Sequence, residues 1–222
     1  MASLKTVADE IIVVDSFSTD NTVDIARASG AAVLQHSFQN HARHFRWAVE
    51  NASITSDWVM RLDADEIVEA DLAEEIKRRL PGLPAEVNGV TLNRKTIFQG
   101  KFIRHGGRFP LIMLRIWRRG MARIEDRWMD EHIYLTEGSA VAFKGGFADY
   151  NLRALNGFTR KHNHYATREA LDRINSRWRL FRQQGQGNSK LTVHQAKAKR
   201  LLKEFLFNRL HYRQHFILSF DM

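Results

Sequence analysis

The sequence of 222 residues contains no cysteine. Disulfide bonds and thiolate metal sites are therefore excluded, and the composition fits a reducing compartment. Apolar runs are short as well, and none approaches the roughly 18–20 residues that a membrane-spanning helix requires. Met1 to Lys5 is not followed by the apolar core of a signal peptide. We therefore expect neither a membrane-spanning helix nor a secretory signal.

Acidic residues are scarce in the C-terminal part of the chain, which is called the basic rear below. From Asn151 onward there are 15 Lys and Arg against 4 Asp and Glu, a net charge of +11. Because the whole chain carries +9, residues 1–150 are left with −2. Basic residues interleaved with aromatic ones favour an anionic membrane surface as a partner of this region. The alternative is a solvated helix face.

A sequence pI near 10.1 also suggests nucleic acid as an alternative partner. However, the chain has no helix-turn-helix, zinc-finger or RNP pattern. Acidic side chains at the ends of predicted strands would repel phosphate unless a cation intervened. A nucleic-acid-binding protein stays an alternative, and we do not expect nucleic acid as a partner.

Short apolar runs alternate with helical patterns in the first half of the chain. This alternation predicts an α/β fold with three layers, in which helices cover both faces of a mostly parallel central sheet. The expected strands and helices are Glu10–Asp15, Asn21–Ser29, Ala31–Leu34, His41–Asn51, Trp58–Leu62 and Leu72–Leu80.

The pattern changes after Glu86. Strands are expected over Val87–Phe102 and Leu111–Trp117, with a Gly106-Gly107 turn between them. Helices are expected over Asn151–Phe181 and Leu191–Asn208. The sequence therefore predicts a core over residues 1–150 and a basic, helical, amphipathic region over residues 151–222.

Two acids follow the predicted strand Trp58–Leu62. If the strand alternation continues, Asp63 and Asp65 leave on the same side. Ions of the Mg²⁺ type are held in this way by one or two carboxylates together with substrate phosphates. The alternative is an N-cap for the next helix, but one acid suffices for a cap and a second would add repulsion without a cation. The pair therefore predicts a site for a cation and a nucleotide diphosphate.

Asp15 ends another predicted strand. Ligands of parallel α/β sheets bind beyond the carboxyl ends of the strands, where Asp15, Asp63 and Asp65 are all expected. Asp15 is thus a candidate for nucleotide binding. Its alternative role is to cap the turn that follows it.

Three motifs in this order resemble family 2 glycosyltransferases of the GT-A, Rossmann-like fold. They are EIIVVDSFSTDNT at Glu10–Thr22, WVMRLDADE at Trp58–Glu66 and WMDEHI at Trp128–Ile133. The later KHNHYA at Lys161–Ala166 is similar to bacterial members that build lipopolysaccharide or exopolysaccharide. The resemblance covers roughly Asp9 to Asp172.

The resemblance implies an inverting, metal-dependent glycosyltransferase. Its donor would be a UDP- or dTDP-sugar, and its acceptor a saccharide or a lipid-linked saccharide. The cofactor would be a divalent cation, Mg²⁺ or Mn²⁺. The protein would act in the bacterial cytoplasm, peripheral on the inner face of the cytoplasmic membrane, in the synthesis of cell-surface polysaccharide.

The resemblance also assigns roles to single residues. Glu131 matches the general base, with Asp130 as the fallback, and an ordinary surface acid is the alternative for Glu131. Asp65 and Asp63 match the two acids of the DxD motif that bind metal, and His162 is a weaker metal candidate that could instead be a helix-surface histidine. Donor-binding candidates are Asp15, Ser16, Ser18, Arg61, Asp63 and Lys161.

Relatives normally begin with a strand and an "ITYNE"-like turn before the equivalent of Asp9. The resemblance therefore leads us to expect truncation at the N-terminus, and also at the C-terminus. Without that strand, backbone groups and apolar surface would be exposed. A catalytically impaired remnant is thus an alternative to an active enzyme. Two further residues, Arg115 and Arg118, either line the active-site face or form salt bridges.

Overall fold

The structure is a computed structural model that describes residues 1–125, 131–151, 155–178 and 216–218. It divides into two compact units, which are considered separately. The first comprises Met1–Asp126, Glu131–Ala154 and Gln214–Met222, and the second comprises Arg127–Asp130 and Leu155–Arg213.

The first part of the chain alternates strands and helices as predicted. Its elements are β1 (Ile12–Asp15), α1 (Thr22–Ala28), β2 (Ala32–Gln35), α2 (His41–Asn51) and β3 (Trp58–Met60). Strands β1 and β2 are parallel, with Ile12 opposite Ala32 and Asp15 opposite Gln35. Asn40 caps the N-terminus of α2, because its side chain accepts a hydrogen bond from the Arg43 N–H at 2.8 Å.

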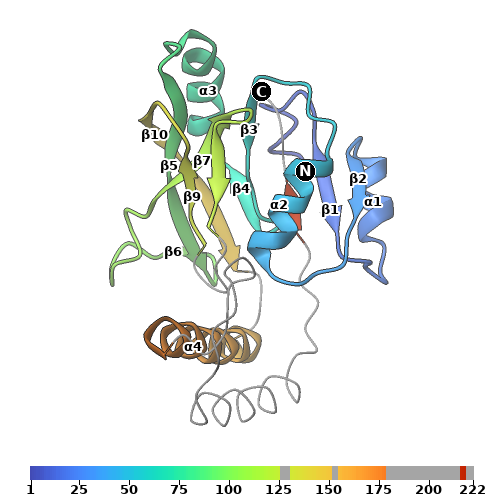
Figure 1. Cartoon of the computed structure of the whole chain (residues 1–222), viewed down its shortest axis with the longest axis vertical. Helices are drawn as coiled ribbons and strands as arrows, with labels where there is room; N and C mark the ends of the chain where they lie inside the picture. Colours follow the sequence, from blue (N-terminus) through green and yellow to red (C-terminus); the bar gives the residue numbers. More distant parts are fainter. Residues whose placement is uncertain (126–130, 152–154, 179–215, 219–222) are drawn as a thin grey trace, which may run out of the picture. The chain divides into compact units, whose positions relative to one another are not determined.

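The next elements of the first unit include the strands that form a second sheet with β3. They are β4 (Glu66–Val68), α3 (Ala70–Arg79), η1 (Leu80–Gly82), β5 (Val87–Phe98), β6 (Lys101–Phe102), β7 (Ile112–Arg118), β8 (Ala122–Ile124), β9 (Ile133–Leu135) and β10 (Ser139–Asn151). The strand order is β3-β7-β5-β10-β4, with β6 added to β5, while β8 and β9 form a separate pair (Figure 1).

The α/β class is confirmed, but fewer strands are parallel than predicted. Parallel pairing joins β1 to β2 and β5 to β10, whereas the other ladders of the described residues are antiparallel. A parallel pair needs a long crossover, usually a helix. After Glu86 the chain instead returns through short connections, so β5 and β7 run in opposite directions.

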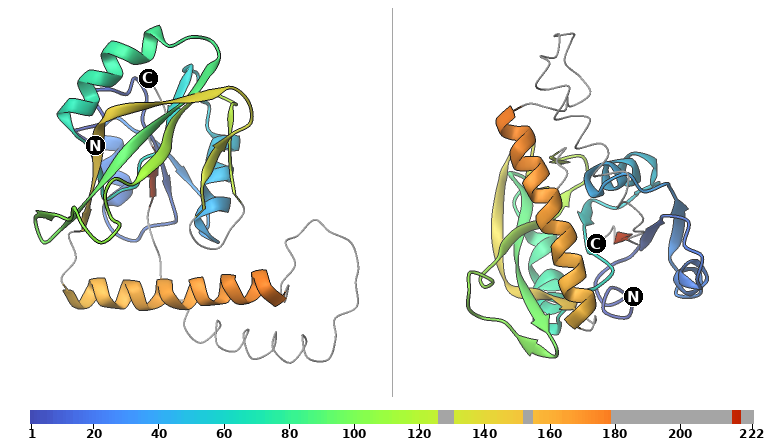
Figure 2. Two further views of the ribbon diagram at one scale, coloured as in Figure 1. Left: turned by 90° about the vertical axis from the view of Figure 1, so that its left-hand side faces the viewer. Right: turned by 90° about the horizontal axis from the view of Figure 1, so that it is seen from below.

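The long strand β10 was not predicted from the sequence. Its residues include Lys144, Gly145 and Gly146, which weaken a strand pattern. Pairing with β5 along most of its length and with β4 holds it in place. The close approach of α3 also requires glycine, because a Cβ at Gly145 would lie 2.5 Å from the Leu72 Cα. Figure 2 shows α3 beside the long strands β5 and β10.

A buried carboxylate fastens α3 to β10. Both main-chain N–H groups of Lys144 and Gly145 donate to Glu75 Oε2 at 2.8 Å. Arg79 donates to Glu75 Oε1 at 2.5 Å. Burial would raise the pKa of Glu75, but these donors outweigh it and hold that pKa below its ordinary value.

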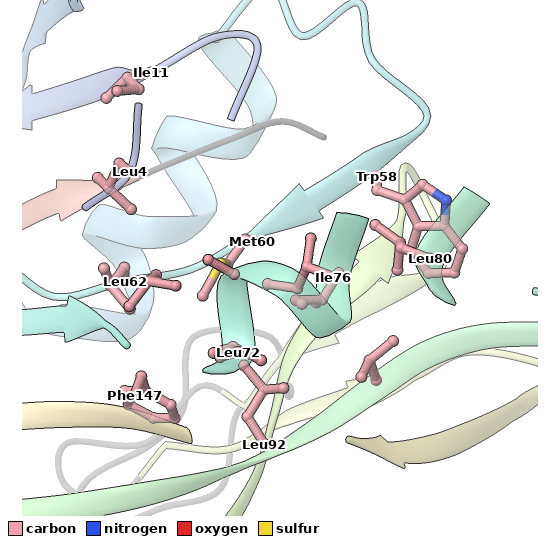
Figure 3. Packing of buried hydrophobic residues seen from close by; sticks show 14 of the residues in the cluster. Leu4, Ile11, Trp58, Met60, Leu62, Leu72, Ile76, Leu80, Leu92 and Phe147 are labelled. Atoms are coloured by element: carbon pink, nitrogen blue, oxygen red, sulfur yellow. The ribbon is translucent and has the colours of Figure 1, made fainter. Parts of the chain in front are cut away.

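The hydrophobic core consists of two clusters that β1 and β3 share. Val13 and Met60 belong to the larger cluster, which also contains Leu72 and Leu92 (Figure 3). The neighbouring residues in each strand, such as Val14 and Val59, belong to the smaller one. Burying such a side chain fully contributes about 1.5–3 kcal/mol. Strands buried on both faces explain why β1 and β3 are continuous apolar runs.

The edge of β1 opposite β2 is paired with β11 (Phe216–Leu218). The pairing is antiparallel, with Ile12 opposite Leu218 and Val14 opposite Phe216. The sequence led us to expect exposed backbone groups here. That expectation is wrong for this edge, because a segment far away in the sequence supplies the neighbouring strand.

The second unit contains α4 (Leu155–Trp178), which lies within the predicted helix Asn151–Phe181. Its exposed apolar side chains include Leu155, Ile174 and Trp178. The predicted helix over Leu191–Asn208 lies outside the described residues. Among the residues that the structure describes, no helix is both long enough and apolar enough to span a membrane.

Replacement of Phe216 by proline should release β11 from β1. The carbonyls of Ile11 and Asp15 accept from residues beside β2, so strand alternation turns the N–H and C=O groups of Ile12 and Val14 toward β11. Proline removes the N–H that Phe216 would donate. We expect the Ile12 and Val14 amides to exchange hydrogen as fast as loop amides, measured by NMR.

The amides of Val13 and Asp15 serve as the internal control, since they point toward β2. They should keep their protection in the Phe216→Pro variant. Equal loss of protection at all four positions would indicate general unfolding, and unchanged protection at Ile12 and Val14 would contradict the pairing with β11.

Candidate functional site

Strand β1 delivers Asp15 to the carboxyl edge of the sheet, where the side chain is buried. Asp15 Oδ2 accepts from the Ser18 N–H and from Gln35 Nε2, both at 3.0 Å. The Ser18 hydroxyl donates to Asp15 Oδ1. The carboxylate thus caps the turn that follows it, as the alternative interpretation predicted. A role in nucleotide binding stays a prediction.

The same turn contains a buried hydroxyl with unused hydrogen-bonding capacity. Ser16 Oγ is buried and has no hydrogen-bond partner within the described ranges. Phe17 is exposed and has a positive φ of 58°, which residues other than glycine rarely adopt. A buried polar atom without a partner costs free energy unless a ligand or water meets it. The turn therefore presents a polar group that a bound molecule could satisfy.

Asp63 and Asp65 lie in the connection between β3 and β4. Strand β3 ends at Met60, so strand alternation does not orient these two acids as the sequence suggested. The Asp63 side chain is 25% exposed, and Asp65 is an exposed residue. The N-cap alternative is wrong, because α3 begins at Ala70 with Glu69 in the cap position.

Arg61 connects Asp63 to Glu131. Its Nε lies 3.4 Å from Asp63 Oδ1, and its Nη2 lies 3.3 Å from Glu131 Oε1. The guanidinium also lies over the Phe45 ring, 5.1 Å from the centroid. Only 10% of the Glu131 side chain is exposed, which excludes an ordinary surface acid. The buried Arg61 guanidinium therefore brings together Asp63, the candidate metal ligand, and Glu131, the candidate general base.

Arg115 forms a second link beneath the Asp63 turn. Its Nη2 donates to Glu66 Oε1 at 2.8 Å, and its Nη1 lies 3.9 Å from Asp63 Oδ1. The salt-bridge alternative is thus confirmed for Arg115. Arg118 is the last residue of β7, and its guanidinium donates to the Val87 and Leu83 carbonyls.

These charges shift the carboxyl groups in opposite directions. Burial alone would raise the pKa of Asp63, but the guanidinium groups of Arg61 and Arg115 hold it below its ordinary value. Burial, assisted by the Asp63 charge, raises the pKa of Glu66 to about 7 despite Arg115. Asp63 is therefore ionised at neutral pH, as a ligand of a divalent cation must be.

Three further candidates are Lys161, His162 and Asp130. Lys161 and His162 belong to α4 in the second unit, where the His162 ring Nδ1 lies 2.9 Å from the Phe158 carbonyl oxygen. Asp130 lies outside the described residues. The donor role of Lys161, the metal role of His162 and the fallback base role of Asp130 stay predictions.

Sequence reasoning did not assign Glu66, Gln35 or His44 to the site. His44 is a buried residue of α2. Its Nε2 lies 3.4 Å from the Val14 carbonyl oxygen, and its Nδ1 lies 3.4 Å from the His36 Nδ1. The sequence did contain a signal for Glu66, because a carboxylate three residues after Asp63 can return to its N–H. Gln35 gave no such signal, since its contact depends on the register of β1 and β2.

Comparisons with known proteins identify the family of this chain. The family described as "Glycosyl transferase family 2" matches residues 2–150. An uncharacterized glycosyltransferase of Rickettsia prowazekii is 39% identical over 75 residues, which are 34% of this chain and 25% of the relative. One from Rickettsia bellii is 40% identical over the same share of each chain. The chain thus spans about a quarter of the curated relatives that it matches.

Protonation of His44 should destabilise the fold. Burial lowers the pKa of His44 below the ordinary value of about 6.5. The unfolded chain therefore takes up this proton more readily, so the stability is complete above pH about 6.5 and is lost as the pH falls toward the folded-state pKa. Urea unfolding of the wild type and of His44→Gln between pH 5 and 8 measures the effect.

Glu66 titrates in an overlapping range with the opposite sign, because its raised pKa makes the fold less stable as the pH rises toward about 7. The His44 contribution is therefore the difference between the two curves. We expect the variant to lose less stability on acidification. Parallel curves would contradict the lowered pKa.

Proposed function

This chain belongs to glycosyl transferase family 2, and from that premise we propose that it transfers a sugar from a nucleotide diphosphate to an acceptor hydroxyl with inversion. The acceptor oxygen forms a bond to the anomeric carbon as the bond to the leaving diphosphate breaks. The electron pair of that bond leaves with the diphosphate, and the hydroxyl proton passes to a carboxylate of the enzyme.

One observation carries the proposal: Arg61 contacts both Asp63 and Glu131. The side chain predicted to bind the donor and the metal, Asp63, and the side chain predicted to accept the proton, Glu131, therefore both contact one guanidinium. An in-line displacement needs the leaving group and the base to be held close together with the reacting carbon between them.

The Asp63–Asp65 turn fits a hard divalent cation, Mg²⁺ or Mn²⁺. Asp63 is ionised at neutral pH and Asp65 is exposed. In the described part of the chain, no group of three or more His, Cys, Asp or Glu side chains could hold a metal ion. The donor set is thus two carboxylates, which a substrate diphosphate and water would complete. A cation bound there would neutralise the charge of the leaving diphosphate.

Glu131 acts as the general base in this proposal. Its carboxylate is mostly buried and accepts a hydrogen bond from the Arg61 guanidinium, which keeps it oriented. Arg61 itself is buried, so it serves the reaction by holding Asp63 and Glu131. The turn after Asp15, with the buried Ser16 hydroxyl, is the proposed contact for the nucleotide.

The acceptor we propose is a saccharide or lipid-linked saccharide of bacterial cell-surface polysaccharide synthesis. The motif KHNHYA at Lys161–Ala166 and the basic rear support this context. The rear would bind an anionic membrane surface on the cytoplasmic side, with UDP- or dTDP-sugars as donors. A catalytically impaired remnant would keep the fold without binding a nucleotide.

The Asp65→Ala variant should lose metal-dependent nucleotide binding. Titration of UDP and dTDP with and without Mn²⁺ should show cation-dependent affinity in the wild type. We expect the variant to bind at least about tenfold more weakly, since even indirect partners of a metal contribute that much. Asp57→Ala, an exposed acid just before β3, is the matched control and should bind normally. Wild-type binding that ignores Mn²⁺ would contradict the proposal.

The Glu131→Gln variant should bind the nucleotide but fail in transfer. Loss of a general base lowers kcat by about 10²–10⁴-fold. The amide still accepts from Arg61, so the Mn²⁺-dependent affinity for UDP should stay within a few-fold of the wild type. Release of UDP from a panel of UDP-sugars measures turnover. Turnover equal to the wild type would remove Glu131 from the reaction.

A further inference from the structure

We propose that Glu66, held by Arg115, is a positioning residue that fixes the Asp63–Asp65 turn in the conformation that receives the cation and diphosphate. This inference rests on the proposed function. It concerns a residue that touches neither the cation nor the nucleotide, and it identifies what holds the two carboxylates that do.

Asp63 and Glu66 are joined by reciprocal hydrogen bonds. The Asp63 N–H donates to Glu66 Oε2 at 2.8 Å, and the Glu66 N–H donates to the Asp63 carbonyl at 2.9 Å. The two bonds close a ring around Ala64 and Asp65. A four-residue turn closed at both ends has few other conformations open to it.

Arg115 fixes this ring to the sheet. Glu66 Oε1 accepts from Arg115 Nη2 at 2.8 Å, so both carboxylate oxygens are occupied by different donors. The Arg115 guanidinium also donates to the Arg61 carbonyl at 3.4 Å and lies 4.8 Å from the centroid of the Phe147 ring. Glu66 and Arg115 are almost fully buried, with side chains 2% and 4% exposed, so water does not compete for these bonds.

The exposed side of the turn is held by the main chain. The Tyr150 N–H donates to the Asp65 carbonyl at 2.8 Å, just beyond the register of β10 with β4. Because β3 ends at Met60, strand pairing does not set the conformation of Asp63 and Asp65. The Glu66 carboxylate supplies that constraint instead. Residues that orient metal ligands typically change metal affinity about 10–100-fold when they are mutated.

Glu75 offers a matched control elsewhere in the same unit. It is also a buried carboxylate that accepts main-chain N–H groups and pairs with an arginine. Replacing it by alanine strands buried donors in the same way, yet it supports the contact of α3 with β10. General destabilisation should therefore affect Glu66→Ala and Glu75→Ala alike, while loss of positioning should affect only Glu66→Ala.

The experiment compares the wild type, Glu66→Ala, Glu66→Gln and Glu75→Ala by thermal unfolding and by UDP titration with and without Mn²⁺. We expect both alanine variants to unfold at a lower temperature. Below their unfolding transitions, Glu66→Ala should bind UDP about 10–100-fold more weakly in Mn²⁺, whereas Glu75→Ala should match the wild type. Glu66→Gln keeps an oxygen that accepts from the Asp63 N–H, so its affinity for UDP should lie between those of Glu66→Ala and the wild type. If Glu66→Ala does not fold, Glu66→Gln tests the positioning role by comparison with the wild type alone.

The outcomes separate the two proposals. A wild type that binds no UDP in Mn²⁺ would overturn the proposed function, and this inference with it. If the wild type binds UDP and Glu66→Ala binds it equally well, the positioning role alone is overturned. If Glu66→Ala does not fold, equal binding by Glu66→Gln and the wild type has the same meaning. Affinity losses that follow the unfolding temperature equally in Glu66→Ala and Glu75→Ala would also overturn it.

Discussion

Two buried guanidinium groups, Arg61 and Arg115, compensate three carboxylates around the connection between β3 and β4. Arg61 pairs with Asp63 and Glu131, and Arg115 pairs with Glu66. Without these cations, acids in so little water would repel one another and take up protons. The network therefore allows Asp63 to remain charged while mostly buried. It also decides where β3, β4 and β7 can lie, because Arg61 follows β3, Glu66 begins β4 and Arg115 belongs to β7.

The fold creates this arrangement by bringing distant segments into register. Antiparallel pairing of β3 with β7 sets Met60 opposite Ile116, so Arg61 and Arg115 follow on adjacent strands. The Arg61 N–H donates to the Arg115 carbonyl at 3.0 Å, which continues the ladder by one more bond. On the far side, β10 pairs with β4 and supplies the Tyr150 N–H to Asp65. Strands that are remote in the sequence thus hold the Glu66 carboxylate, through Arg115, and the Asp65 main chain, through Tyr150.

Local patterns explain what could be predicted from the sequence. The helix from His41 to Asn51 and the strand ending at Asp15 follow from the spacing of apolar residues, which acts over a few residues. The strand expected over Trp58–Leu62 is also present, although it ends at Met60. The placement of Asp15 at the end of a strand, and of Asp63 and Asp65 after one, follows from the same patterns. Strand β10 could not be predicted in this way, because Lys144, Gly145 and Gly146 favour a strand only when β5, β4 and α3 surround them. The partners of Arg61 and Arg115 likewise depend on pairing between strands, which apolar periodicity does not encode.

Asp63 and Asp65 look alike in the sequence, yet the structure gives them different surroundings. Asp63 is tied through its main chain to Glu66 and through its side chain to Arg61, so its carboxylate already has a positive neighbour before any ligand arrives. Asp65 is exposed, and its carbonyl accepts a hydrogen bond from the Tyr150 N–H of β10. Under the proposed function, the cation would therefore meet one carboxylate, Asp63, that Arg61 and Glu66 already hold in place, and an exposed acid, Asp65, whose main chain is held by β10.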